Sequence, residues 1–270
     1  WLERLVTPFE NQNVASAGGF VRGRNGIEYQ WRALLCDACG DDHPLSIDEA
    51  QPYTVVPSDG AQFAKMQGTN VAFRASALKQ IGGFDVGFRF FLDETDVSKR
   101  LADAGYDSAF VPFAQVHHGF AESEQRSDGR VPKTLVDLGA SKRRYLEKHA
   151  VTSHHAGSIQ AFVSEQRNRL IGLMVEGRIE PRDVARLIAS LQEGFDAPVH
   201  DVTKASLPRT DRGFQPLGHS TPDIFEVIGG SSLSKSALMK AAKLNAQNNK
   251  PTLVMMFSIT TLFHKREYDL

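Results

Sequence analysis

The chain has 270 residues, of which 41% are hydrophobic and 23% charged, with a formal net charge of -1. This composition is that of an ordinary globular protein, so it excludes a disordered, collagen-like or coiled-coil chain. The near-zero net charge provides no global basic field and argues against nucleic acid as the main partner. Two cysteines, Cys36 and Cys39, are too few for a disulfide framework, and we expect a reducing compartment, the cytoplasm.

The two ends of the sequence suggest a piece of a longer chain. It begins at Trp1, already inside an apolar pattern typical of an amphipathic helix, and it stops at Leu270. The longest apolar run, residues 253–263, is interrupted by Ser and Thr and is too short to span a bilayer. No signal peptide is visible. Peripheral contact with the inner face of a membrane stays open.

Residues 1–60 predict short elements. A helix ends near residue 9, and strands over 14–17 and 20–22 are separated by a turn at Gly18-Gly19. Asn25-Gly26 is a hairpin signal. Residues 36–60 are rich in Asp, Pro and Ser and predict a loop.

Residues 66–117 carry the strongest pattern. A strand or turn at 66–73 leads to a helix over 76–81 that stops at Gly82-Gly83. A second helix begins near Asp93, because apolar residues then recur every three or four positions, and it ends at Gly105. Extended segments over 106–111 and 115–117 follow, with Pro112 between them.

The C-terminal part begins with helices. They are expected over 134–149, 158–175 and from Pro181 to Gly194. Residues 195–222 are rich in Pro, Gly and Asp and predict a linker. A strand over 224–228, a helix over 234–248 and a strand over 253–259 then predict a small βαβ unit.

Three carboxylates fall within four residues at the start of the second helix: Asp93, Glu94 and Asp96. The free N–H groups and the dipole of a helix N-terminus stabilise negative charge, so capping by Asp93 explains an isolated cluster of this kind. The neighbouring segments favour a functional role instead. Gly82 to Asp85 precede the cluster, Arg100 follows it, and the next strand ends in His117-His118.

Taken together, these segments resemble the second half of the catalytic domain of inverting glycosyltransferase family 2, which has the GT-A fold. The resemblance covers about residues 1–120, with none claimed beyond 150. The segments that carry it are Gly68 to Arg74, Ile81 to Asp85, Phe91 to Asp96, Arg100-Leu101, Ala104 to Tyr106 and Val111 to His118.

The resemblance implies an α/β fold: a partial GT-A-like (Rossmann-like) domain followed by helices and a small βαβ unit. Residues 1–150 would form the acceptor-side half of the domain, without the N-terminal donor-binding half. Residues 151–200 would form a helical segment, and 201–270 a linker and a small, truncated α/β extension.

In this family an acidic pair at the corresponding helix start supplies the general base. The base removes the proton of the acceptor hydroxyl, which attacks the anomeric carbon with inversion and displaces a nucleoside diphosphate. The family order is Glu-Asp, whereas this chain has Asp93-Glu94. We align the base with Glu94, and regard Asp93 and Asp96 as neighbours able to exchange roles with it.

The resemblance also assigns binding residues. Gly68, Thr69 and Asn70 match the segment beside the acceptor pocket, although a plain turn before a strand explains them equally well. Arg100 is assigned to substrate binding with them. His118 matches a family histidine near the metal and the diphosphate, where imidazole can ligate Mg or Mn or contact phosphate; one structural hydrogen bond is the alternative.

The family holds its divalent metal, Mg or Mn, mostly through an Asp-x-Asp motif in the N-terminal half. We therefore expect the present chain to be inactive alone. The parent enzyme would transfer a hexosyl or rhamnosyl group from a nucleotide-sugar donor to a glycan or lipid-linked acceptor, in polysaccharide biosynthesis. Basic residues on the later helices either face solvent or meet anionic lipid: Lys142, Arg143, Arg144, Lys148, Arg167 and Arg169.

Two other functions stay open. One is a non-catalytic carbohydrate-binding or scaffolding module with the same fold. The other is a nucleotide- or phosphate-binding regulatory domain at 223–270, where Gly229 to Ser236 nearly match a phosphate-binding loop but have Ser234 in place of the required glycine. Cys36 and Cys39 have metal-site spacing, with His43 as a third ligand and no fourth.

Overall fold

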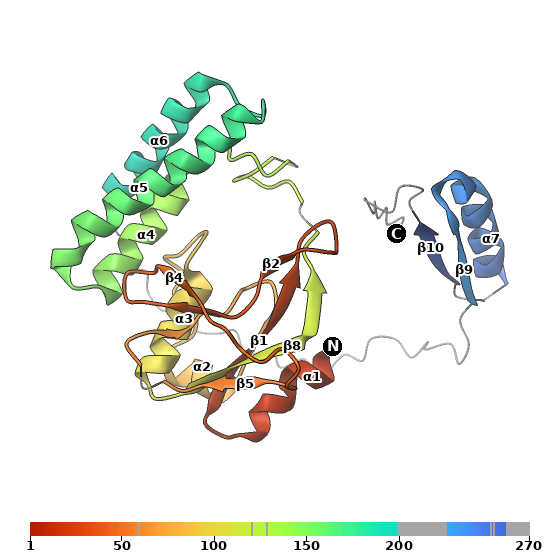
Figure 1. Cartoon of the computed structure of the whole chain (residues 1–270), viewed down its shortest axis with the longest axis horizontal. Coiled ribbons are helices and arrows are strands. Elements are labelled where there is room, and N and C mark those ends of the chain that lie inside the picture. The colour runs from red at the N-terminus through yellow and green to blue at the C-terminus, as the bar shows by residue number, and fades with distance from the viewer. Residues whose placement is uncertain are drawn as a thin grey trace, which may run out of the picture. The chain divides into compact units, whose positions relative to one another are not determined.

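The computed structural model describes residues 1–58, 60–119, 121–127, 129–198, 226–248, 250 and 252–257. The chain divides into two compact units, Trp1–Ala205 and Ser206–Leu270. Both are drawn in Figure 1.

A five-stranded mixed sheet forms the base of the first unit. The strand order is β2-β1-β8-β5, and β7 also pairs with β1. β1 and β8 are parallel, and the other pairs are antiparallel. This sheet and its helices confirm the predicted α/β class. The strands are β1 Val14–Arg22, β2 Tyr29–Trp31, β5 Thr54–Val56, β7 Val71–Phe73 and β8 Asp107–His117.

A smaller antiparallel sheet overlaps the segment that was expected to be a loop. It has the order β4-β3-β6. The loop prediction for residues 36–60 is thus wrong in part, because β4 and β5 both fall inside it. These strands have only three residues each, too few for a periodic pattern to show. The strands of the small sheet are β3 Leu34–Cys36, β4 Asp42–Pro44 and β6 Phe63–Ala64.

Two groups of helices complete the first unit. α2 and α3 pack on the sheet through a buried cluster that includes Ala77, Val97 and Leu101. α4, α5 and α6 form a separate layer with its own core around Phe162, Leu170 and Leu187 (Figure 1). The helices predicted for 151–200 are thus in one unit with residues 1–150. The helices are α1 Leu2–Val6, η1 Thr7–Glu10, α2 Ala75–Gln80, α3 Asp93–Asp103, α4 Val136–His149, α5 Thr152–Val175 and α6 Pro181–Asp196.

The turn expected at Gly18-Gly19 is wrong, since both glycines lie inside β1. A Cβ on Gly19 would lie 1.8 Å from the Ala114 carbonyl oxygen, and one on Gly18 would lie 2.7 Å from Met66 Sδ. Glycine is required there because neighbouring groups approach the strand too closely for a side chain. The hairpin signal at Asn25-Gly26 is confirmed: β1 pairs with β2 beyond a turn in which Gly26 has φ +71°.

The two extended segments expected around Pro112 form one strand, β8. The register with β1 shifts between Gly19 and Val21, which pair with Val111 and Val116. Pro112 therefore sits in an irregular stretch of the ladder, where its missing N–H does no harm.

Glycine also sets the close approach of α4 and α6. A Cβ on Gly194 would lie 2.0 Å from the Val136 carbonyl oxygen, whereas one on Gly172 in α5 would meet nothing within 4 Å. We expect Gly194→Ala to destabilise the protein by about 1–3 kcal/mol through overpacking. Gly172→Ala should instead stabilise it by about 0.5–1 kcal/mol, as alanine does within a helix. Urea unfolding measures both, and equal midpoints for the two variants would contradict the proposed contact.

The second unit has the predicted βαβ arrangement. β9 and β10 are parallel, with Glu226 opposite Thr252, and α7 connects them. Most of the predicted linker and the end of the last predicted strand lie outside the described residues. The suggested nucleotide-binding role of this region remains a prediction. The elements are β9 Glu226–Ser231, η2 Ser232–Ser234, α7 Lys235–Gln247 and β10 Thr252–Phe257.

Candidate active site

Two unusual backbone conformations precede the acidic helix α3. Phe91 and Leu92 have φ values of +82° and +66°. Left-handed conformations at non-glycine residues cost about 1–3 kcal/mol each and persist where packing enforces them. The Leu92 side chain is buried beside Tyr145, and the Phe91 ring stacks on Phe162 with centroids 5.8 Å apart. Contacts with α4 and α5 therefore fix the direction in which α3 begins.

Glu94 is the carboxyl group of this cluster with the most altered acidity. Burial, together with a hydrogen bond to Asp93 and the charge of Asp93, raises its pKa to about 7. Gly68 lies beside it, since a Cβ built there would be 3.8 Å from Glu94 Cδ. Two adjacent carboxyls that share a proton give one group able to accept a proton near neutral pH. The pair therefore has the acidity of a general base.

Asp96 has a different environment, two residues further along α3. Its side chain is fully buried, and its oxygens accept hydrogen bonds from His149 Nε2 at 2.8 Å and Arg100 Nε at 2.8 Å. Lys148 Nζ lies 2.6 Å away. Burial alone would raise the pKa of Asp96, but these three partners outweigh it and lower the pKa to about 2. The exchange of roles with Glu94 therefore does not fit. The Asp96 carboxylate is buried and bound by His149, Arg100 and Lys148, so it anchors α3 instead.

Arg100 is committed to the protein rather than to a substrate. Besides the bond to Asp96, its Nη1 donates to the Ile81 carbonyl at 2.8 Å and its Nη2 to the Gly83 carbonyl at 2.7 Å. The guanidinium thus joins α3 to the glycine turn that ends α2. This geometry corrects the predicted substrate-binding role of Arg100.

Asn70 likewise makes internal contacts. It is 1% exposed. Its Nδ2 donates to the carbonyls of Phe20 at 3.0 Å and Ala114 at 2.7 Å, and its Oδ1 accepts from the Trp1 indole at 3.1 Å. Both amide protons are used, so Asn70 connects β1 and β8 instead of offering them to a sugar. Of the predicted acceptor segment, Gly68 and Thr69 remain at the surface.

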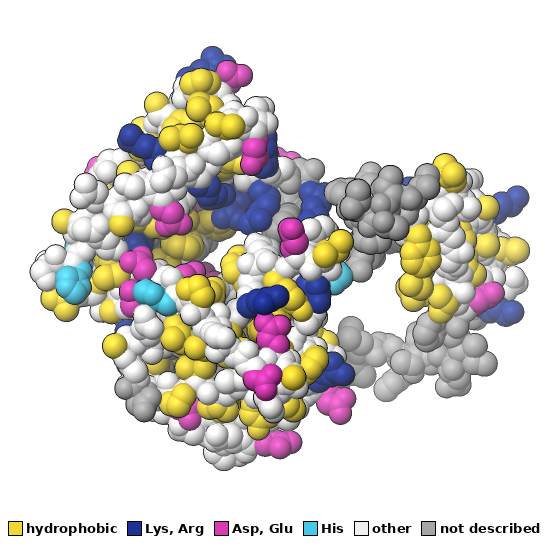
Figure 2. Space-filling view, viewed as in Figure 1, with side chains coloured by type: hydrophobic (Ala, Val, Ile, Leu, Met, Phe, Trp, Pro, Cys, Tyr) yellow, Lys and Arg dark blue, Asp and Glu magenta, His cyan; other side chains and the backbone are white. Residues whose placement is uncertain are grey.

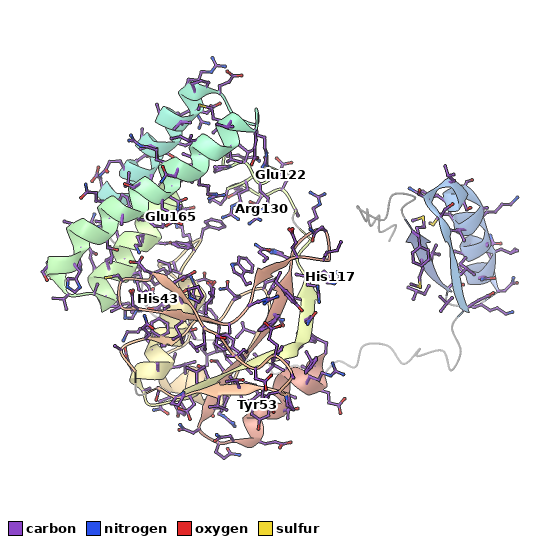
Figure 3. The ribbon with its side chains drawn as sticks, viewed as in Figure 1. His43, Tyr53, His117, Glu122, Arg130 and Glu165 are labelled. Carbon is purple, nitrogen blue, oxygen red and sulfur yellow. The ribbon has the colours of Figure 1, made fainter. Side chains whose placement is uncertain are left out.

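His118 follows the last residue of β8. Its Nδ1 shares a 2.9 Å hydrogen bond with Gln30 Oε1, and its ring lies 5.7 Å from that of Trp31. Burial, and then the charges of Arg130 and Arg126, lower its pKa. Figure 3 labels the neighbouring His117 at this end of the sheet.

The described part of the chain has no group of three or more His, Cys, Asp or Glu side chains that could hold a metal ion. The assignment of His118 as a metal ligand therefore remains a prediction. In the Cys36–Cys39 loop, His43 instead bonds to Asp37 at 3.0 Å, and burial raises the pKa of Cys36 to about 12, which disfavours the thiolate that a metal requires.

Comparison with known proteins finds a similarity in this region. Residues 41–157 match the family model described as "Glycosyl transferase family group 2". This part of the chain is similar to glycosyltransferase family 2. The predicted resemblance is confirmed, although the match starts later than expected and continues through α4 into the start of α5.

Two curated proteins are similar to part of this chain. Each is described as an N-acetylglucosaminyl-diphospho-decaprenol L-rhamnosyltransferase, from Mycobacterium tuberculosis strains CDC 1551 / Oshkosh and ATCC 25618 / H37Rv. Each is 38% identical over 61 residues, which are 23% of this chain and 20% of the relative. The matched segment thus spans about a fifth of the length of these relatives.

The basic residues of α4 have partners within the protein. Lys142 is buried and donates to the Cys39 carbonyl at 2.7 Å, and Arg143 bonds to Glu147. Arg144 and Lys148 both contact Asp85. Lys148, together with Arg167 and Arg169 on α5, is nevertheless exposed, so contact with anionic lipid stays a prediction. Among the described helices, none has the length and apolar character to cross a bilayer.

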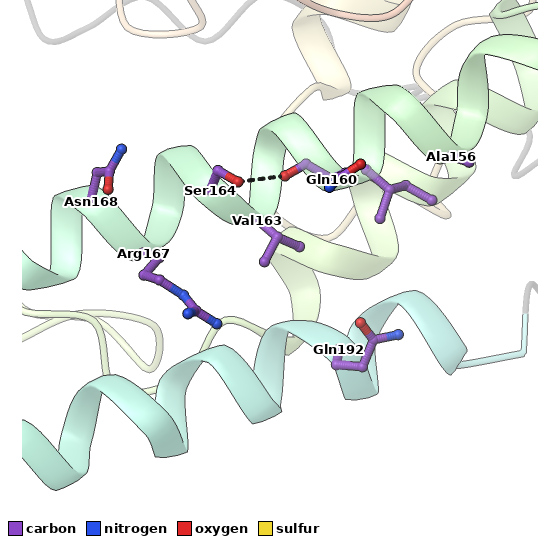
Figure 4. Close-up of a pocket in the computed structure, with 8 residues that line it drawn as sticks. Ala156, Gln160, Val163, Ser164, Arg167, Asn168 and Gln192 are labelled. Carbon is purple, nitrogen blue, oxygen red and sulfur yellow. Dashed lines mark hydrogen bonds between the residues drawn. The ribbon is translucent and has the colours of Figure 1, made fainter.

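A groove of about 630 Å³ runs between α5 and α6 of this unit (Figure 4). Ile159, Val163, Arg167 and Gln192 are among the residues that line it. Glu94 does not line it, so this groove is not the site of the proton transfer. Two residues of α4, Lys148 and His149, contact Asp96. The sequence did not predict these contacts, because Asp96 lies about fifty residues earlier in the chain.

Proposed function

We propose that this chain carries the acceptor-activating part of an inverting glycosyltransferase. The observation that supports it best is the Asp93-Glu94 pair: a half-buried carboxyl with a pKa raised to about 7, beside the bare backbone of Gly68, within the region that matches the family. A base of this acidity is largely ionised just above neutral pH, yet basic enough to accept a proton from a hydroxyl as it becomes a nucleophile.

In the proposed reaction Glu94 takes the proton of the acceptor hydroxyl. The hydroxyl oxygen bonds to the anomeric carbon from the face opposite the leaving group, and the bond to the nucleoside diphosphate breaks with its electron pair. Burial and the neighbouring Asp93 together raise the pKa of Glu94. The Asp96, Arg100, Lys148 and His149 contacts hold α3 in place and take no part in proton transfer.

The donor is proposed to be a nucleotide sugar, and the acceptor a glycan or lipid-linked sugar of polysaccharide biosynthesis. The names of the two relatives favour a rhamnosyl group and an N-acetylglucosaminyl-diphospho-lipid acceptor. The family's divalent metal is not accommodated by the described residues alone, since His118 is not accompanied by two further ligands there. We therefore propose that donor and metal are held mainly by a donor-binding half, and that the chain without it does not transfer sugar.

A pH profile tests the role of the pair. In an enzyme with both halves, the rate at saturating substrates should rise with pH until Glu94 is ionised near pH 7, and then level off. Asp93→Asn removes the charge that raises the pKa of Glu94, so the rise should move to lower pH. Asp103→Asn, an exposed change on the same helix, should leave the profile in place. A rise that stays at the same pH in Asp93→Asn would show that another group controls the reaction.

A further inference from the structure

Lys65 is a buried cation beside the small sheet. It follows β6 directly, and the residue is 6% exposed. Its backbone N–H donates to the Leu34 carbonyl at 2.9 Å, and its ammonium Nζ lies 2.6 Å from Asp42 Oδ1 of β4. A buried ion pair adds little to stability compared with apolar side chains of similar size. Stability alone therefore does not favour a lysine at this position.

The partner of Lys65 belongs to an acidic part of the surface. Asp37, Asp41 and Asp42 all reach the surface at β4 and in the turn before it. Figure 2 shows acidic side chains on this face of the first unit, and Figure 3 labels His43 of β4 there. The side chain of Asp42 is 42% exposed, whereas that of Lys65 is 8% exposed. Water therefore screens the carboxylate of this pair more than the cation.

The segment that carries Lys65 lies against the first turn of α3. The Met66 N–H donates to Ser98 Oγ at 3.4 Å, and the Ser98 hydroxyl donates to the Glu94 carbonyl at 2.8 Å. A Cβ on Gly68 would lie 3.8 Å from Glu94 Cδ. These contacts hold residues 65–68 beside the proposed base.

Opposite charges act on Glu94 from two elements. Burial, and then Asp93 of α3, raise the pKa of Glu94, whereas its own backbone N–H and the charge of Lys65 lower it. Cys36 of β3 also senses Lys65, but burial raises the pKa of this thiol to about 12, so it is uncharged at neutral pH. The cation thus lies between the small sheet and the start of α3.

Other charged groups packed near α3 have partners of their own. Lys99 pairs with Asp103 further along the helix, and Lys142 of α4 pairs with Asp41. Three side chains bind the carboxylate of Asp96: Arg100, Lys148 and His149. Lys65 differs from these groups, because its charge acts on Glu94 as well as on its own partner.

We propose that Lys65 is a positioning residue that acts through Glu94: its buried cation favours the ionised carboxylate that accepts the proton of the acceptor hydroxyl. The Asp42 carboxylate holds the ammonium in place and moderates its effect. Charges act over longer distances in a poorly solvated site than in water, so Lys65 needs no contact with the substrate. The inference rests on the proposed function for its consequence in catalysis. The link between Lys65 and Glu94 can be measured without it.

NMR titration of the chain tests this link. The signal of the Glu94 carboxyl carbon is assigned by its loss in Glu94→Gln, and its midpoint is expected at about pH 7 in wild type. Lys65→Met removes the charge that favours ionisation, so the midpoint should rise by about 0.5 to 1 on the pH scale. Lys65→Arg keeps the charge and should restore most of the wild-type value. The matched control Lys99→Met removes another paired lysine, on α3 itself, and should titrate like wild type.

A second variant separates this role from a structural one. Asp42→Asn keeps a hydrogen-bond acceptor for the Lys65 ammonium but removes the negative charge. The cation then acts more strongly on Glu94, and the midpoint should fall. Lys65→Met and Asp42→Asn break the same ion pair, so a loss of structure alone would move both midpoints in the same direction. Circular dichroism checks that each variant is folded.

An unchanged midpoint in folded Lys65→Met, or shifts of the same sign in the Lys65→Met and Asp42→Asn proteins, would overturn the inference. In an enzyme with both halves, the rise of the transfer rate with pH should follow these midpoints, while affinity for the acceptor stays unchanged. A pH profile that stays in place while the midpoint moves would reject the role in catalysis. The proposed function fails separately, if Glu94→Gln is fully active. An unmoved titration instead rejects only the role of Lys65 and leaves the base intact.

Discussion

Changing Glu94 to Gln should reduce sugar transfer by about 10²–10⁴-fold in an enzyme with both halves, while substrate binding is retained. The amide has nearly the same size as the carboxyl but cannot accept the proton of the acceptor hydroxyl, and general-base catalysis typically contributes this factor. Transfer rates at saturating donor and acceptor, with affinity for the acceptor measured separately, give the two quantities needed.

The control for this change is Asp103→Asn, which also turns a carboxylate of α3 into an amide. Asp103 is exposed and pairs with Lys99 on the same helix, so transfer should stay close to that of wild type. Undiminished turnover by Glu94→Gln would favour the non-catalytic carbohydrate-binding module as the function of this fold.

Removing the Asp96 carboxylate should destabilise the protein by about 3–5 kcal/mol. Asp96→Ala leaves His149, Arg100 and Lys148 around a buried site without the negative charge that they share, and breaking a buried ion pair from one side has this cost. Urea unfolding at neutral pH measures the loss. Asp103→Ala removes an exposed pair on the same helix and should cost less than about 1 kcal/mol.

The pH dependence of unfolding gives a second measure of Asp96. Its pKa is lowered from 3.8 to about 2 in the folded protein, so the unfolded state binds the proton more tightly. The stabilisation is complete above pH 3.8 and is lost as pH falls through about 2. Asp96→Ala should lack this portion of the acid-induced loss, and the same acid profile in both proteins would contradict the assigned contacts.

Much of the fold could be predicted where the apolar pattern is long or where residues typical of a helix end bound it. The helix beginning at Asp93 and the helix beginning at Pro181 are both observed, because apolar spacing and terminal residues specify a helix locally. The glycines of β1 were misread as a turn, since only the neighbouring Ala114 and Met66 explain why no side chain fits there. The sequence does not show which neighbouring groups will pack against these glycines in the folded protein.

The candidate site could likewise be predicted only in part. The importance of the acidic cluster and the alignment of the base with Glu94 followed from its segments, whereas the buried contacts of Asp96 required the structure. Asp96 and Arg100 have the i, i+4 spacing of a helical ion pair, and this spacing could have indicated a structural role. The other partners of Asp96, Lys148 and His149, come from α4. Contacts between residues so far apart in the sequence are set by tertiary packing.

Asn70 was assigned to a sugar because its amide both donates and accepts. The structure shows those same groups joined to the Phe20 and Ala114 carbonyls and to the Trp1 indole. Buried polar groups must find partners, and an asparagine between two parallel strands finds them in the backbone. The ability of the Asn70 amide to donate and accept hydrogen bonds does not show whether its partner is a sugar or the backbone.

The left-handed residues Phe91 and Leu92 have a consequence for catalysis. Because folding has already confined the chain ahead of Asp93, an arriving acceptor does not have to order this segment before it can react. The carboxyl pair that we propose as the base is preorganised, so binding free energy that would otherwise be consumed in ordering a loop remains for lowering the activation barrier.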